Sequence, residues 1–188
     1  MCPIDSLEHR LEVRGIVREV GKNGIVLADK KRLRKVIFEH GTDFYSAGEF
    51  NIGDIASGMY LKVVSVKPQP NPKVTNELPT AAYVGISREA GVFSNPIVLR
   101  EWNFRRSVDG DRKNFILTFN DENNSEFQYT STATLGVFFL ERLTWDSIKI
   151  GSHALVQGYQ DADNYCIAFG TLNALRIIID NDNVLPSK

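Results

Sequence analysis

Short runs of hydrophobic residues, many alternating with polar ones, recur along the whole chain. The first half carries five runs, at residues 11–20, 24–28, 35–40, 59–66 and 81–86. The second half carries five more, at residues 96–104, 114–119, 126–132, 153–159 and 165–179. Turn-forming Gly, Asn, Asp or Pro residues bound each run, and this arrangement is typical of β-strands joined by turns. The pattern therefore predicts an all-β protein.

Two segments leave the type of element open. Residues 132–143, "TATLGVFFLERL", fit either a short helix or another strand, because their apolar residues have mixed spacing. Residues 42–50 could hold one helical turn. Residues 67–79 contain four of the seven prolines, and proline lacks the N–H that a central strand must donate. We expect residues 67–79 to form a long surface loop.

The chain divides into two similar halves near a connector at residues 87–96. Each half contains five candidate strands, the number found in an OB-type barrel. A faint repeat supports the division: residues 50–66 and 148–162 both contain Ile-Gly followed by a polar residue and then an alternating run. We predict two tandem small barrels of OB or cold-shock type, at residues 8–88 and 95–181.

Composition indicates an ordered globular protein, with 43% hydrophobic and 24% charged residues. No apolar run reaches the roughly 20 residues that span a bilayer, and the charged N-terminus is unlike a signal peptide. Cys2 and Cys166 are too few for a disulfide framework or a cysteine-rich zinc site. We expect an intracellular protein, either cytoplasmic or nuclear.

Charge is distributed unevenly between the halves. Residues 1–88 hold 13 Lys and Arg against 10 Asp and Glu, whereas residues 89–188 hold 9 against 13. Five of the six residues from 30 to 35 are cationic. This asymmetry favours a first half that faces nucleic acid and a second half with another partner.

The first half resembles a cold-shock domain over about residues 11–86. Residues 37–40, "IFEH", match in order the Val/Ile-Phe-x-His motif of that family, Gly53 and Asp54 match its turn, and residues 79–84 suit its last strand. The resemblance implies an OB-type barrel that binds single-stranded RNA or DNA. The chain departs from the family at residues 22–27, "KNGIVL", where the aromatic residues of the second strand are missing, each worth about 1 to 3 kcal/mol per stacked base.

The candidate nucleic-acid contacts are a set of cations and a possible stacking pair: Lys22, Lys30, Lys31, Arg32, Arg34, Lys35, Phe38 and His40. The cations would track phosphates, although a solvated loop would look the same. We expect Phe38 and His40 to share the outer face with Val36, which would turn Ile37 and Glu39 inward. The opposite register, with Phe38 in the core, stays open.

Possible contacts in the second half are Trp102, Arg105, Phe127 and Tyr129. The spacing of Phe127 and Tyr129 suits stacked bases, but it suits a barrel core better. Trp145 could anchor either a core or an interface. The acidic balance of this half favours a protein partner.

Enzymatic signatures are missing from the sequence. It has no Gly-rich phosphate loop and no nucleophile elbow, and His9, His40 and His153 are dispersed. We therefore expect no catalysis, cofactor or metal. Two functions remain: a protein that binds single-stranded RNA or DNA through its first barrel, or an OB-type protein-interaction scaffold in a ribonucleoprotein or a telomere or DNA-maintenance complex.

Overall fold

The computed structural model describes residues 11–30, 32–66, 78–106, 114–132, 135–159 and 171–185. Within these residues the fold is almost entirely β, as predicted. The strands are β1 (Leu11–Gly21), β2 (Gly24–Asp29), β3 (Arg32–Glu49), β4 (Tyr60–Val66), β5 (Thr80–Ser87), β6 (Ile97–Arg106), β7 (Asn114–Asp121), β8 (Glu126–Thr132), β9 (Gly136–Arg142), β10 (His153–Tyr159) and β11 (Thr171–Ile179). Two single-turn 3-10 helices, η2 (Ile52–Asp54) and η3 (Trp145–Ser147), precede β4 and β10.

Every run predicted from the sequence lies on a strand, the last one from residue 171 onward. Both segments left open are strands as well: residues 136–142 form β9, and residues 42–49 continue β3. The β-branched and aromatic residues of these segments suit a pleated sheet. Most of the predicted proline-rich loop, residues 67–77, lies outside the described residues.

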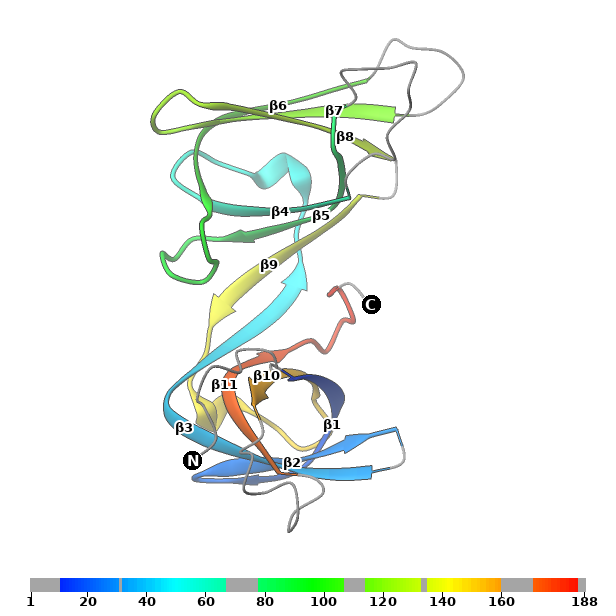
Figure 1. The fold of residues 1–188 in the computed structure, drawn as a ribbon, viewed down its shortest axis with the longest axis vertical. Coiled ribbons are helices and arrows are strands. Elements are labelled where there is room, and N and C mark those ends of the chain that lie inside the picture. Colours follow the sequence, from blue (N-terminus) through cyan, green and yellow to red (C-terminus); the bar gives the residue numbers. More distant parts are fainter. Residues whose placement is uncertain are drawn as a thin grey trace, which may run out of the picture. The chain divides into compact units, whose positions relative to one another are not determined.

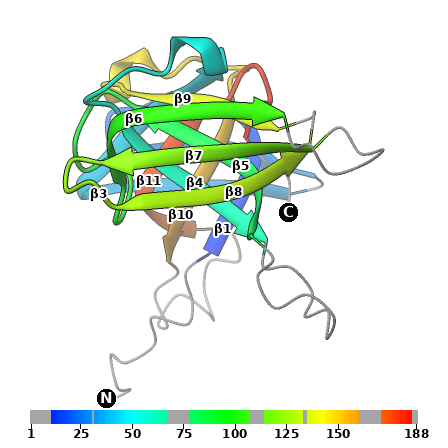
Figure 2. The same cartoon turned by 90° about the horizontal axis from the view of Figure 1, so that it is seen from above.

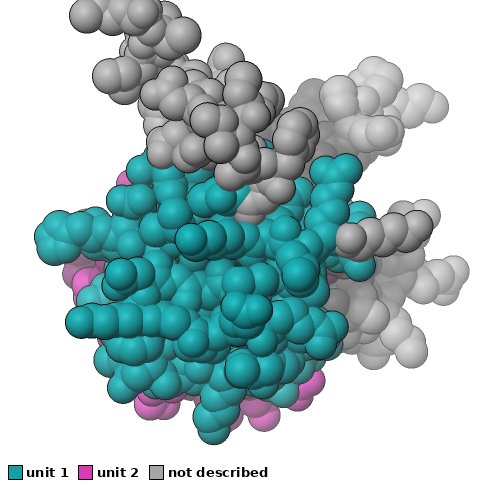
Figure 3. Space-filling model, turned by 90° about the horizontal axis from the view of Figure 1, so that it is seen from below, with its two compact units in different colours: residues 1–47, 142–183 teal, residues 48–141, 184–188 magenta. Residues whose placement is uncertain are grey.

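The chain forms two compact units that do not follow its two halves (Figure 3). Unit 1 comprises residues 1–47 and 142–183, and unit 2 comprises residues 48–141 and 184–188. The predicted boundaries, 8–88 and 95–181, therefore differ from these units. Two of the crossings between units fall inside strands, in β3 after Ala47 and in β9 after Glu141.

Unit 1 is a closed five-stranded barrel (Figure 1). Its strands follow one another in the order β1, β2, β3, β11 and β10, and β10 pairs again with β1. All neighbours are antiparallel except β11 and β3, which are parallel. Three consecutive strands followed by a fourth that returns beside the first make a Greek key, the connectivity of an OB-type barrel.

Alternation along the strands builds the core of unit 1. Val17, Leu27 and Val36 on three successive strands are fully buried, and they join side chains of β10 and β11 in one apolar cluster. Because successive side chains of a strand point to opposite faces, the residues between them lie on the outer surface. These residues of β1, β2 and β3 form the outer face of the barrel among the described residues.

Unit 2 uses β4 to β9, and its core is a second apolar cluster that contains Leu61, Val84 and Phe119. Strands β6, β7 and β8 run side by side as an antiparallel sheet (Figure 2). Strand β4 pairs with both β5 and β6, and β5 runs parallel to β8 and β9. A single residue pair, Thr80 with Thr130, joins β5 to β8.

The prediction of two tandem barrels is not confirmed, because each unit combines strands from both halves of the sequence. This also removes the charge asymmetry. Unit 1 holds 12 Lys and Arg and 12 Asp and Glu, and unit 2 holds 10 and 11. Neither unit is markedly acidic, so the inference of a protein partner for an acidic second half loses its electrostatic basis.

Candidate nucleic-acid interface

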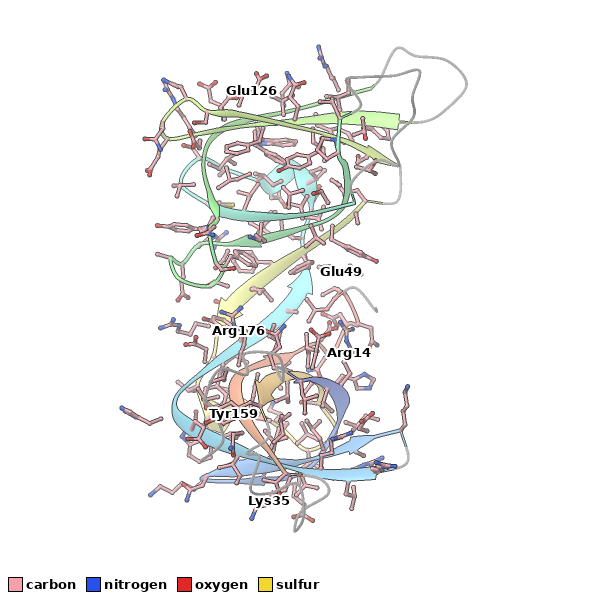
Figure 4. All side chains as sticks on the ribbon, in the orientation of Figure 1. Arg14, Lys35, Glu49, Glu126, Tyr159 and Arg176 are labelled. Carbon is pink, nitrogen blue, oxygen red and sulfur yellow. The ribbon has the colours of Figure 1, made fainter. Side chains whose placement is uncertain are left out.

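A shallow groove of about 300 Å³ lies on β1, β2 and β3 of unit 1. Glu19 of β1 is paired with Val26 of β2, which is paired with Lys35 of β3, so these residues form a row across the sheet. Gly21 and Gly24 are paired in the neighbouring row. Because these two residues have no side chains, they leave the sheet hollow beside Lys35, which is exposed and carries its ammonium group on the outer side of the barrel (Figure 4).

Gly24 is required for close approach of two strands. A Cβ atom at this position would overlap the carbonyl oxygen of Val36 on β3. No side chain fits there without moving the backbone of one strand. The hollow beside Lys35 is therefore built into the pairing of β2 with β3.

Four of the predicted cations are exposed on β2, β3 and their turns, and one of them, Lys35, lines the groove. Lys22 lies in the turn from β1 to β2, Lys30 lies in the turn from β2 to β3, and Arg32 and Lys35 lie on β3. None of the four forms an ion pair with another residue in the described part of the chain. Lys31 lies outside the described residues.

Arg34 differs from the other cations. Its Nε donates to the Asp29 carboxylate at 3.1 Å, and both side chains are about one-quarter exposed. Arg32 and Arg34 both lie on the side of β3 that carries the buried Val36, but Arg32, the first residue of the strand, is exposed and forms no ion pair within the described residues. We therefore assign Arg34 to the structure of the hairpin rather than to the candidate interface.

Lys30 adopts a left-handed backbone conformation, with φ of 50°. A residue with a Cβ pays roughly 1 kcal/mol or more in this region, where glycine, asparagine or aspartate is preferred. A two-residue hairpin turn usually carries such residues. Turn geometry therefore does not account for a lysine at position 30. Glycine and asparagine, which suit this conformation better, lack the positive charge that lysine carries.

The predicted orientation of "VIFEH" is wrong. Val36 is fully buried, and Phe38 packs against the same core, where its ring meets that of Phe44 edge-on at 5.0 Å between centroids. His40 is exposed, next to Gly41 with its φ of 94°. The structure shows the opposite register, in which Val36 and Phe38 both pack into the core of unit 1. It creates no buried histidine, since the alternation ends at the bend around Gly41.

Three of the four candidates in the second half belong to a core. Trp102, Phe127 and Tyr129 pack against the apolar cluster of unit 2, and the Trp102 indole N–H donates to the carbonyl of Ile55 at 3.0 Å. Burial raises the pKa of the Tyr129 phenol. Arg105 is exposed on the opposite face. Trp145, whose role was open, is 39% exposed on η3.

Sequence reasoning missed the groove itself. Glu19, Gly21, Gly24 and Val26 line it with Lys35, and none of these four was singled out in advance. The usable signal was the hairpin "EVGKNGIV", in which Gly21 and Gly24 flank the two-residue turn and pair with each other. The cations were found because they are consecutive in sequence, whereas the groove needs three strands in register.

A larger apolar hollow of about 530 Å³ lies in unit 2. Phe50, Ile52, Phe104 and Phe115 line it, and the rings of Phe104 and Phe115 are stacked at 4.6 Å. Glu49 is the only charged residue among the described residues that line it. A carboxylate repels phosphate, and no Lys or Arg among the described lining residues offsets it, as Lys35 offsets Glu19 in the groove of unit 1, so this hollow does not suit a nucleic-acid backbone.

The described residues contain no cluster of three or more His, Cys, Asp or Glu side chains placed to hold a metal ion. None of the helices in the described part of the chain is long and apolar enough to cross a membrane. Comparisons with models of protein families, with curated proteins and with solved structures find no match for this chain. The cold-shock resemblance therefore stays a prediction.

Proposed function

We propose that this protein binds single-stranded RNA or DNA on the outer face of β1, β2 and β3. The observation that carries the proposal is a set of exposed cations on this segment of unit 1: Lys35, which lines the groove, Lys22 and Lys30 in the turns on either side of β2, and Arg32 at the start of β3. Lysine and arginine side chains without acidic partners are the groups that neutralise phosphates. An OB-type barrel uses this face for oligonucleotides, and the barrel of unit 1 has that connectivity.

The proposed mode of binding is mainly electrostatic. The three outer-facing rows formed by β1, β2 and β3 contain no aromatic side chain in the described residues; their members are Ile16, Ala28 and Leu33, then Glu19, Val26 and Lys35, then Gly21, Gly24 and Ile37. Stacking, which supplies about 1 to 3 kcal/mol per base, is therefore not available from these rows. Binding should be tolerant of sequence and steeply dependent on salt.

The test is a triple substitution, Lys30→Ala, Arg32→Ala and Lys35→Ala, titrated with single-stranded RNA and DNA oligomers at several salt concentrations. Each lost phosphate contact should lower the slope of log affinity against log salt by about 0.7, so the triple variant should lose about 2. The weakening should be alike for all oligomer sequences.

The matched control removes the same charge elsewhere, through Arg88→Ala, Arg100→Ala and Lys149→Ala, which are all exposed. The control should keep the wild-type slope. An equal loss in the two variants would show a general charge effect, and an unchanged slope in the first variant would remove the four cations from the interface.

A second candidate is a protein-interaction scaffold in a ribonucleoprotein or DNA-maintenance complex. Exposed apolar side chains of unit 1 favour it: Leu33 is 65% exposed, Trp145 39% and Ile150 69%. Of these three residue types, tryptophan is the one enriched among the energetic anchors of protein interfaces. Oligomer affinity that stays negligible even at low salt would favour this second function.

A further inference from the structure

The last two strands of each half of the chain match residue by residue. In unit 2, Val64 of β4 pairs with Tyr83 of β5; in unit 1, Gln157 of β10 pairs with Arg176 of β11. Both members of the second pair lie 93 positions after those of the first (64 and 157, 83 and 176). The next pairs, Ser65 with Ala81 and Gly158 with Ala174, follow a bulge in each hairpin at this same distance.

The segments that lead into β4 and β10 match as well. Each has a three-residue 3-10 helix, then five residues, then a seven-residue strand. Ile55 and Ile148 close the two helices and are both buried. Gly58 and Gly151 adopt positive φ angles of 85° and 91°. The repeat expected from the sequence is therefore real, but its members are Gly58 and Gly151, and not the Ile-Gly pairs at 52–53 and 150–151.

The separation of 93 positions extends to the strands that receive these hairpins. Thr80 of β5 pairs with Thr130 of β8, and Asn173 of β11 pairs with Ile37 of β3. Asn173 lies 93 positions after Thr80, and Thr130 lies 93 positions after Ile37. Beyond the bend, Arg176 pairs with Asp43, and Tyr83 pairs with Gly136. The single long strand β3 thus corresponds to β8 and β9 taken together.

Burial follows the same correspondence. Ala81 and Ala174 are buried, as are Val84 and Ile177, and Ile86 and Ile179. Even the buried polar residues that come next, Ser87 and Asp180, are 93 positions apart. Two unrelated hairpins would not share register, bulge, turn conformation and burial over this length.

We propose that the chain is an internal duplication of one OB-type unit and that its two copies have exchanged their last two strands. In the first copy, β1 to β3 precede β4 and β5; in the second, β6 to β9 precede β10 and β11. The structure pairs β1 and β3 with β10 and β11, and it pairs β6 and β8 with β4 and β5. Each copy therefore completes the barrel of the other.

This exchange makes the two halves obligate partners. Unit 1 loses two of its five strands if residues 97–185 leave, and unit 2 loses β4 and β5 if the first half leaves. Separation would expose Val17, Leu27 and Val36, which are fully buried. Two tandem domains, by contrast, would each keep a complete core after cleavage between them.

The test is a cut in the intact folded protein. A specific protease site is inserted between Ala90 and Gly91, which are both exposed in the loop from β5 to β6, and the uncut variant must keep the wild-type melting temperature. After cleavage, we expect the two fragments to elute together at the volume of the uncut 21.1 kDa chain and to separate only in denaturant. Elution as two separate folded fragments would overturn the exchange.

A second measurement covers the case in which the inserted site disturbs folding. Gly58→Ala and Gly151→Ala place a Cβ in open space at positions with the same backbone strain. A duplication predicts losses of melting temperature that agree within a few degrees in the otherwise unaltered chain. A large loss from one substitution and none from the other would contradict the correspondence. Neither experiment depends on nucleic-acid binding, so the proposed function can fail while this inference stands.

Discussion

Replacing Phe38 with alanine should destabilise the protein without weakening a ligand contact. The ring packs against the core of unit 1 and against Phe44, but it is only partly buried. Removing a fully buried phenylalanine costs about 3 to 5 kcal/mol, of which an aromatic pair contributes about 0.5 to 1.5 kcal/mol. Partial burial places Phe38→Ala near the lower end, at about 3 kcal/mol.

Urea unfolding followed by circular dichroism measures this loss. With a typical slope of about 2 kcal/mol per molar urea, the midpoint should fall by roughly 1 to 2 M. His40→Ala is the matched control on the same strand: its side chain is exposed, so its unfolding free energy should change by less than about 0.5 kcal/mol. An unaltered midpoint for Phe38→Ala, with weaker oligomer binding by the folded variant, would refute the observed register and restore the stacking pair.

Two further predictions concern Gly24 and Tyr129. Gly24→Ala should lower the melting temperature and disturb the β2–β3 pairing, because its Cβ overlaps the carbonyl of Val36; Gly48→Ala, with open space around the added atom, is the control. Burial raises the pKa of Tyr129, so its contribution to stability is complete below the unfolded pKa of about 10 and is lost as pH rises through the folded value. Stability should therefore fall less steeply at alkaline pH in Tyr129→Phe; an identical pH profile would contradict this assignment.

The candidate site was only partly predictable. Consecutive cations are visible in any sequence, and Lys22, Lys30, Arg32 and Lys35 are indeed exposed. The orientation of "VIFEH" was ambiguous because apolar residues occupy both parities of the strand: Val36 and Phe38 on one, Ile37 on the other. Register against β2 and β11 decides which set is buried, and that information is not local.

The sequence by itself determined the strands, since alternation and turn residues act over a few neighbouring positions. Its predicted division into two halves corresponds to the two proposed copies, but not to the two compact units. Only the tertiary structure decided which hairpin closes which barrel. The β4–β5 and β10–β11 hairpins share register, bulge and burial, so either has the local geometry to close either barrel. The choice rests on side-chain packing between segments far apart in the chain, which no local pattern records.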